Sequence, residues 1–199
     1  MERSLVIIKP DGTVRRRVGA LVIDALLRQG YRVRAFKEMK VSEALAKMHY
    51  AVHKDKPFFP WLVKFITAAP VVVMILEGEG VIEGIRNALG ATFVQKAAPD
   101  SLRGRYGIWA GVNIAHASDG PQTAAEEIAL WKREGGLEET DDAEQKARAY
   151  VDRYIKGDTD YTSQIRHVVR SAIENGNASE PVLQTLRDLL AKDAEGIES

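Results

Sequence analysis

The stretch Asn113-Ile114-Ala115-His116-Ala117-Ser118-Asp119-Gly120-Pro121 joins a short apolar run to a turn and carries one histidine just before that turn. Residues 122–131 then place apolar side chains close to helical spacing. His116 is therefore expected where a strand end, a turn and a helix start meet. Backbone N–H groups at a helix N-terminus carry partial positive charge, so this corner can hold an anion. An imidazole placed there suits chemistry on phosphate.

Composition limits the class of protein. The chain has 199 residues, enough for one full core with an appended subdomain, and its 28 Lys and Arg balance 28 Asp and Glu. This balance gives no reason to expect a nucleic-acid or membrane partner. The absence of cysteine excludes disulfides, thiol catalysis and thiolate metal sites. No apolar run reaches membrane-spanning length, so we expect a soluble, cytoplasmic protein.

Hydrophobic periodicity predicts the elements that precede this stretch. Ser4–Ile8 reads as a buried strand that Lys9-Pro10-Asp11-Gly12 ends, which leaves Lys9 at its tip. Ser42 is a candidate N-cap. The predicted strands are residues 4–8, 31–39, 71–77 and the segment around His116; the predicted helices are residues 18–29, 42–50, 61–67, 79–89 and 122–131.

The resulting order is β-α-β-α-α-β-α-loop-β-α. It predicts an α+β fold with the ferredoxin-like (split βαβ) topology, an antiparallel four-stranded sheet with helices packed on it. We expect the helices on one face, in two layers. The predicted loop, residues 93–112, contains Arg103 and Arg105, and a long basic loop is often functional.

Residues 136–199 form a C-terminal helical extension to a first unit that spans residues 1–135. Three amphipathic stripes, near residues 147–155, 165–173 and 183–190, predict three helices. Their apolar faces are expected to pack on the core, on each other or on a partner, and the sequence does not choose among these.

Several phosphate-binding and metal signatures are missing. The P-loop pattern is absent, Gly78-Glu79-Gly80 lacks the third glycine of a dinucleotide fingerprint, and the protein-kinase motifs do not occur. His49 and His53 are four residues apart, but the predicted helix ends near Tyr50, so we do not expect a zinc site there.

Asn113–Gly120 matches the active-site signature Asn-x-x-His-[Gly/Ala]-Ser-Asp-[Gly/Ser], and the chain thereby resembles the nucleoside diphosphate kinase family. Further matching segments follow in the family's order: Val6–Gly12, His49–Lys54, Lys56–Phe59, Gly90–Thr92 and Leu102–Gly104. The resemblance covers residues 3–131. It implies reversible transfer of the γ-phosphate from a nucleoside triphosphate to a nucleoside diphosphate, by a ping-pong mechanism through a phosphohistidine.

By this resemblance His116 is the nucleophile, since a neutral imidazole has a lone pair and needs no general base. Glu127 corresponds to the glutamate that holds the proton of the other ring nitrogen, and Ser118 to the serine that positions it. The alternative for Glu127 is an exposed first-turn glutamate stabilised by the helix dipole, but with His116 as the nucleophile the functional role is favoured.

The remaining implied site residues surround the nucleotide. Phe58 matches the base-stacking ring, although Phe58 and Phe59 could equally fill the core. Lys9, Arg86 and Arg103 match phosphate-binding cations that could each be simple surface charges. Asn113 matches the ribose contact, while Thr92 and Tyr50 match hydroxyl-bearing positions near the phosphates and the histidine.

The implied cofactor is Mg²⁺, carried by the phosphates of ATP or another nucleoside triphosphate, without a dedicated protein cage. Asp119 either touches its water shell or caps the turn. The implied partners are nucleoside di- and triphosphates and further copies of the chain in a homo-oligomer.

Three features depart from the family pattern: Phe93-Val94, where Asn-Pro is usual; Arg105, where an acidic residue is common; and the long extension. The first two bear on subunit contacts. Two other functions stay open: a nucleotide-binding or scaffold module without turnover, and a phosphorelay domain that passes phosphate from His116 to a protein.

Overall fold

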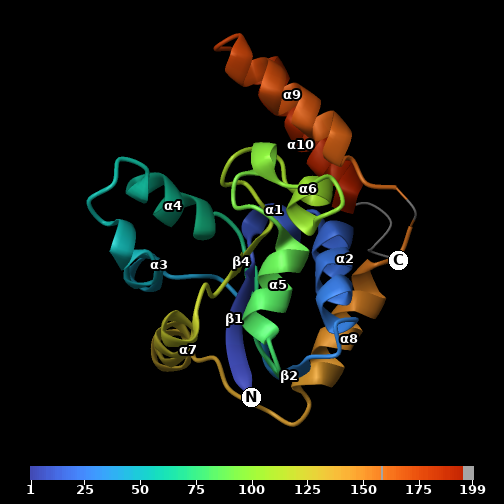
Figure 1. The fold of residues 1–199 in the computed structure, drawn as a ribbon. Coiled ribbons are helices and arrows are strands. Elements are labelled where there is room, and N and C mark those ends of the chain that lie inside the picture. The colour runs from blue at the N-terminus through green and yellow to red at the C-terminus, as the bar shows by residue number, and fades with distance from the viewer. Residues whose placement is uncertain (158, 195–199) are drawn as a thin grey trace.

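The computed structural model describes residues 1–157 and 159–194; residue 158 and residues 195–199 of the predicted extension lie outside the described residues (Figure 1). The fold is built on a four-stranded sheet in which every neighbouring pair is antiparallel, in the order β2-β3-β1-β4. The predicted α+β, ferredoxin-like class is confirmed. Its strands are β1 (Glu2–Ile8), β2 (Arg32–Met39), β3 (Val71–Gly78) and β4 (Ala115–Ala117).

The two central strands, β1 and β3, are buried on both faces. Alternate residues of β1 belong to two different core clusters: Val6 and Ile8 to one, Leu5 and Ile7 to the other. The same alternation holds along residues 71–76 of β3. Continuous apolar runs are what a strand needs when both of its faces are covered.

Helices accordingly cover both faces, so the expected two-layer arrangement is wrong (Figure 1). One cluster contains residues of α2 (Arg16–Leu27), α5 (Val81–Leu89) and α8 (Ala143–Tyr154). The other contains residues of α3 (Glu43–His49), α4 (Phe59–Ile66) and α7 (Pro121–Gly135).

The predicted boundaries agree closely where a cap is present. Ser42 caps α3 by accepting a hydrogen bond from the Leu45 N–H at 3.2 Å. Short elements account for the differences from prediction: α1 (Pro10–Thr13) replaces a simple turn, and the expected loop 93–112 contains the 3₁₀ turn η2 (Val94–Lys96) and α6 (Leu102–Tyr106). A second 3₁₀ turn, η1 (Ala51–His53), follows α3. Elements of three to five residues are too short to show a hydrophobic period.

The extension forms three helices, as predicted: α8, α9 (Thr162–Glu174) and α10 (Glu180–Ala194). Its first helix joins the main core, because Ala147, Tyr150, Val151 and Tyr154 are buried in the cluster that includes α2 and the sheet. The last two helices pack on each other, and α10 also contacts α2.

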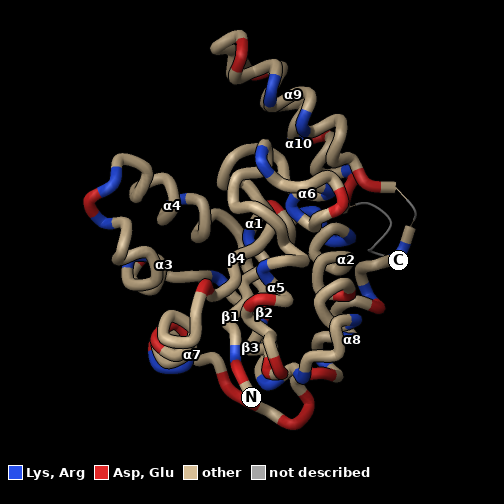
Figure 2. Tube along the Cα trace, viewed as in Figure 1, with Lys and Arg blue, Asp and Glu red and all other residues tan. Residues whose placement is uncertain are grey.

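Charge is mixed over the surface. Figure 2 shows basic and acidic positions interspersed along most elements, in agreement with the balanced composition. Among the residues that the structure describes, no helix combines the length and apolar character needed to cross a membrane.

Candidate active site

A cleft of about 1030 Å³ lies beside β4, enough to enclose a ligand of a few hundred daltons. The residues that line it come from segments far apart in the sequence, from Lys9 to Ile173. Nine of the ten predicted site residues contribute to its wall: Lys9, Tyr50, Phe58, Arg86, Thr92, Arg103, Asn113, His116 and Glu127. The tenth, Ser118, contacts one of these nine, and Asp119 also lines the cleft.

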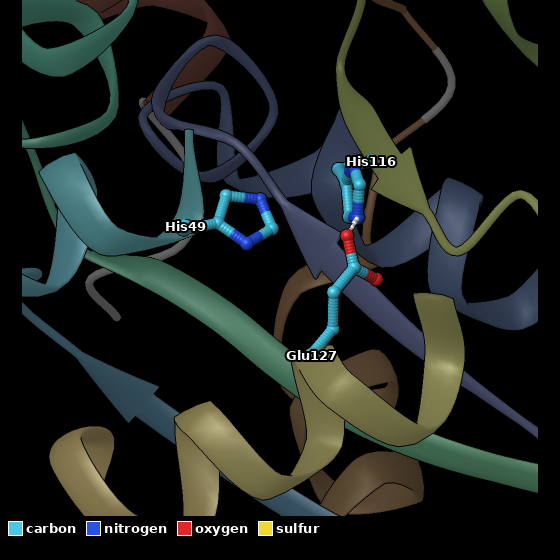
Figure 3. Close-up of side chains that lie close together, drawn as sticks. All are labelled: His49, His116 and Glu127. Carbon is cyan, nitrogen blue, oxygen red and sulfur yellow. Dashed lines mark ion pairs between the residues drawn. The ribbon is translucent and has the colours of Figure 1, made fainter. Parts of the chain in front are cut away.

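His116 stands in the middle of β4, where it pairs with Ile7 of β1, and its side chain is largely shielded from solvent. Glu127 projects from α7 so that its Oε1 lies 2.8 Å from His116 Nε2 (Figure 3). The second carboxylate oxygen, Oε2, accepts a hydrogen bond from Ser118 Oγ at 2.7 Å. Ser118 Oγ in turn accepts from the Leu5 N–H at 3.0 Å, which ties this chain of contacts to the sheet.

The backbone before His116 is strained. Ile114 has φ 66°, a left-handed conformation that is rare for a β-branched residue. Two contacts hold it there: its N–H donates to Asp11 Oδ2 at 2.9 Å, and its carbonyl accepts from the Lys9 N–H at 2.8 Å. Strain of this kind persists only where the surroundings enforce it, and it occurs here one residue after Asn113 and two before His116.

Two of the three predicted cations are buried. Lys9 Nζ donates to Asn113 Oδ1 at 2.8 Å, and burial lowers the pKa of Lys9 to about 8, partly offset by Asp11. Arg103 donates to the Gly90 and Ala115 carbonyls at 2.9 and 2.8 Å. Burial, with nearby Arg86, lowers the pKa of Arg103 to about 10, so its guanidinium remains charged at neutral pH. Buried cations without a carboxylate bonded to them favour an incoming anion.

The other predicted residues lie around the rim and the wall. Asn113 Nδ2 donates to the Thr92 carbonyl at 2.7 Å, which joins two segments of the cleft. Phe58 is 48% exposed, so it does not fill the core, whereas Phe59 packs partly against a core cluster. The Tyr50 hydroxyl has no hydrogen-bond partner among the described residues, and burial raises the pKa of Tyr50.

The departures from the family pattern also lie on or near the cleft. Phe93 is 55% exposed and lines the wall, and a Cβ on Gly107 would approach Val94 Cγ2 to 2.6 Å, so Val94 packs closely there. Arg105 points outward from α6 as an exposed residue.

His49 begins one of the matching segments, but the sequence did not predict its place beside His116. Its ring meets the His116 ring at 4.7 Å between centroids and 84° between planes (Figure 3). Trp131 Nε1 donates to His49 Nδ1 at 3.3 Å, and burial lowers the pKa of His49 well below its usual value. His49 is therefore a neutral imidazole with its proton on Nε2. No local pattern signals this role, because it depends on α3 meeting β4 and α7. His53 also lines the cleft, but its ring packs against Phe58.

His49, His116 and Glu127 each offer a potential metal-ligand atom, and these atoms lie within 4.8 Å of one another. The bond from Trp131 opposes a metal at this place, since it leaves the proton of His49 on the nitrogen that would have to coordinate. Two imidazoles also fit Mg²⁺ poorly, because Mg²⁺ takes oxygen ligands. Asp119 is an exposed carboxylate on the wall of the same cleft.

Comparison with known proteins agrees with this geometry. A family model described as nucleoside diphosphate kinase matches residues 2–136. The nucleoside diphosphate kinase of Synechococcus sp. (strain JA-3-3Ab) is 49% identical over 137 residues, which cover 69% of this chain and 91% of the relative. That of Microcystis aeruginosa is 49% identical over 131 residues, which cover 66% of this chain and 87% of the relative.

Solved structures give the same result. The Halobacterium salinarum nucleoside diphosphate kinase in complex with CDP has a TM-score of 0.64 at 41% identity and covers 75% of this chain and 97% of its own. The Aquifex aeolicus enzyme has a TM-score of 0.62 at 37% identity and covers 65% of this chain and 93% of its own. The matching sequence, fold and cleft lead to one conclusion: this chain belongs to the nucleoside diphosphate kinase family.

Proposed function

We propose that this phosphotransferase moves the γ-phosphate of a nucleoside triphosphate to a nucleoside diphosphate through a phosphohistidine at His116. The observation that carries the proposal is the contact of Glu127 Oε1 with His116 Nε2 at 2.8 Å, inside a cleft that also holds Lys9, Arg86 and Arg103. A carboxylate at Nε2 keeps the ring proton there and leaves the lone pair on Nδ1.

The reaction then has two balanced steps. His116 Nδ1 attacks the γ-phosphorus, a P–N bond forms, and the bond from phosphorus to the β-phosphate bridging oxygen breaks to release the diphosphate. A terminal oxygen of the second diphosphate attacks the same phosphorus, and the P–N bond breaks. Glu127 stabilises the ring as it gains positive charge, and Ser118 orients Glu127, as an orienting carboxylate does for a catalytic histidine.

The cleft supplies positioning and charge, which phosphoryl transfer chiefly requires. We assign the phosphates to Lys9, Arg86, Arg103 and Thr92, the ribose to Asn113, and the nucleobase face to Phe58. Tyr50 packs against His49, whose ring in turn meets that of His116, and we assign its un-ionised hydroxyl as a donor toward the transferred group. A stacking ring that reads no base edge predicts broad nucleotide specificity.

Mg²⁺ belongs to the substrate in this proposal. The nucleotide phosphates would hold the ion, Asp119 would face its water shell, and the ion would supply charge neutralisation to those phosphates. The chain's own residues orient the nucleotide and hold the ring proton.

We further propose that residues 1–135 are the catalytic region and residues 136–199 its extension, with a homo-oligomeric, cytoplasmic protein as the working form. The end of α7 at Gly135 and the left-handed Gly136 support the boundary, since a left-handed glycine is a common helix terminator. No separate observation favours the scaffold or phosphorelay alternatives.

Incubation with γ-labelled ATP and Mg²⁺ tests the function. We expect an acid-labile, alkali-stable label on the wild type that any added nucleoside diphosphate removes, and no label on His116→Ala. A protein that never takes label is a binding module, and one that loses label only to an acceptor protein is a phosphorelay domain. Labelling of His116→Ala at the wild-type level refutes the assignment.

A further inference from the structure

The short helix α6 carries Arg103, and its C-terminal end is bonded to the extension. An α-helix leaves its last four carbonyls without partners inside the helix. Here Arg166 of α9 donates from Nη2 to the Gly104 carbonyl at 2.7 Å and to the Arg103 carbonyl at 3.3 Å. Its Nε donates to the Gly107 carbonyl at 2.6 Å.

A second guanidinium completes this arrangement from the core side. Arg15, fully buried, donates from Nη2 to the Tyr106 carbonyl at 2.6 Å and from Nε to the Asp11 carbonyl at 2.7 Å. Its Nη1 donates to Thr162 Oγ1 at 3.0 Å, at the start of α9. Two cations from different parts of the chain therefore hold the carbonyl end of α6, where the helix dipole favours positive charge.

The other end of α6 faces the cleft. Arg103 donates to the Gly90 and Ala115 carbonyls, which places its guanidinium against the segment that precedes His116. The extension also reaches the cleft directly, because Val169 and Ile173 of α9 line its wall, and Ile173 is 50% exposed. A five-residue helix has no stability of its own and depends on such tertiary bonds.

We infer that Arg166 is a positioning residue for phosphoryl transfer: through the carbonyl end of α6 it fixes Arg103 in the cleft, and the extension is thereby part of the active-site framework. The inference rests on the proposed function for its kinetic readout. Its physical basis is preorganisation, because a small displacement of a phosphate-binding group lowers the rate steeply.

The test compares Arg166→Ala and Arg166→Lys with Arg170→Ala in the full chain. Arg170 lies one turn further along α9 and pairs with Glu174 at 3.0 Å on the exposed surface, so it is a matched control. We expect Arg166→Ala to lower kcat/KM by roughly tenfold, Arg166→Lys to lower it less because a charged donor group remains, and Arg170→Ala to leave it unchanged.

A double-mutant cycle separates positioning from a general structural effect. In an Arg103→Ala background, Arg166→Ala should cause little further loss of kcat/KM, since Arg166 is inferred to act through the position of the Arg103 guanidinium, which that background lacks. If Arg166→Ala lowered kcat/KM by the same factor in the wild type and in Arg103→Ala, the inference would be overturned. Wild-type kcat/KM in Arg166→Ala would also overturn it.

Amide hydrogen exchange supplies a readout that does not need catalysis. Residues 103–107 should exchange faster in Arg166→Ala than in Arg170→Ala, and ADP should bind more weakly to the first variant. If the wild type transfers no phosphate, the proposed function fails, while unchanged exchange and unchanged ADP binding in Arg166→Ala would sink the inference on their own.

Discussion

At the scale of single residues, His116 differs from the other histidines by what its ring nitrogens face. Glu127 Oε1 lies at Nε2, and Ser118 holds the other carboxylate oxygen. Glu127→Gln keeps the shape but removes the negative charge that offsets the developing positive charge on the ring. We expect the rate of phosphohistidine formation to fall by about one to two orders of magnitude, measured in a single turnover with labelled ATP.

Ser118→Ala serves as the milder companion, since it removes one hydrogen bond to Glu127 and leaves the charge in place. The rate of phosphohistidine formation should fall clearly less in Ser118→Ala than in Glu127→Gln. A Glu127→Gln variant as fast as the wild type would contradict the role of the carboxylate.

Lys9 gives the site a dependence on pH. Burial lowers its folded-state pKa from 10.5 to about 8, so below pH 8 the ammonium form can bind phosphate and above it the charge is lost. We expect kcat/KM, which reports the free enzyme, to fall as pH rises through about 8. Bound phosphates favour the ammonium form, so the corresponding fall in kcat should occur at higher pH.

Lys9→Arg is the control for this profile, because a guanidinium stays charged throughout the range. Whatever its absolute rate, the fall near pH 8 should disappear. A profile identical to that of the wild type would assign the fall to another group.

The residues of the site divide into those that local pattern could reveal and those that it could not. His116, Lys9 and Arg103 stand in contiguous motifs, while Glu127 and Arg86 were predicted from the resemblance over the whole segment, and the structure gathers all five in one cleft. His49 and Arg166 act through contacts with segments more than fifty residues away, such as Trp131 and Gly107. No local spacing encodes such a contact.

At the scale of elements, the backbone conformation just before β4 depends on a contact with α1. Asp11 accepts a hydrogen bond from the Ile114 N–H and so holds the left-handed backbone at Ile114. In the chain, Ile114 lies between Asn113 and His116. Asp11→Ala would leave a buried N–H without its partner. We expect a loss of about 1–3 kcal/mol in the free energy of unfolding, measured by urea denaturation, together with lower kcat/KM.

Asp24→Ala is a suitable comparison, because Asp24 pairs with exposed Arg28 on the surface of α2 at 2.7 Å. Such pairs contribute about 0–1 kcal/mol, so this variant should unfold close to the wild type. Equal stability of the two variants would show that Asp11 does not hold the strained turn.

Strand and helix placement followed from hydrophobic period wherever an element was long enough to show one. The apolar run Val71-Val72-Val73-Met74-Ile75-Leu76 predicted β3 and also contained the evidence for two covered faces, which the two-layer expectation missed. The N-cap Ser101 was a local signal for the start of α6, but its end could not be predicted, because two distant arginines bind its last carbonyls.

At the scale of the whole molecule, the three helices of the extension do not all pack in the same place. The sequence predicted three amphipathic helices but left open where their apolar faces pack. In the structure α8 completes the core over α2 and β2, whereas α9 and α10 lie beyond it, near α6. Hydrophobic periodicity indicates that one face of a helix must be buried. Only the tertiary fold determines which surface covers that face.

Two truncations should therefore behave differently. Deletion of residues 138–199 removes Tyr150, Val151 and Tyr154 and exposes the apolar surface that they cover. We expect a large fall in Tm, binding of a hydrophobic dye, and aggregation. Deletion of residues 158–199 retains α8 and should keep a cooperative unfolding transition, while kcat/KM falls at least as far as in Arg166→Ala. Thermal unfolding and steady-state kinetics together check both outcomes, and equal stability of the two truncations would show that α8 contributes nothing to the core.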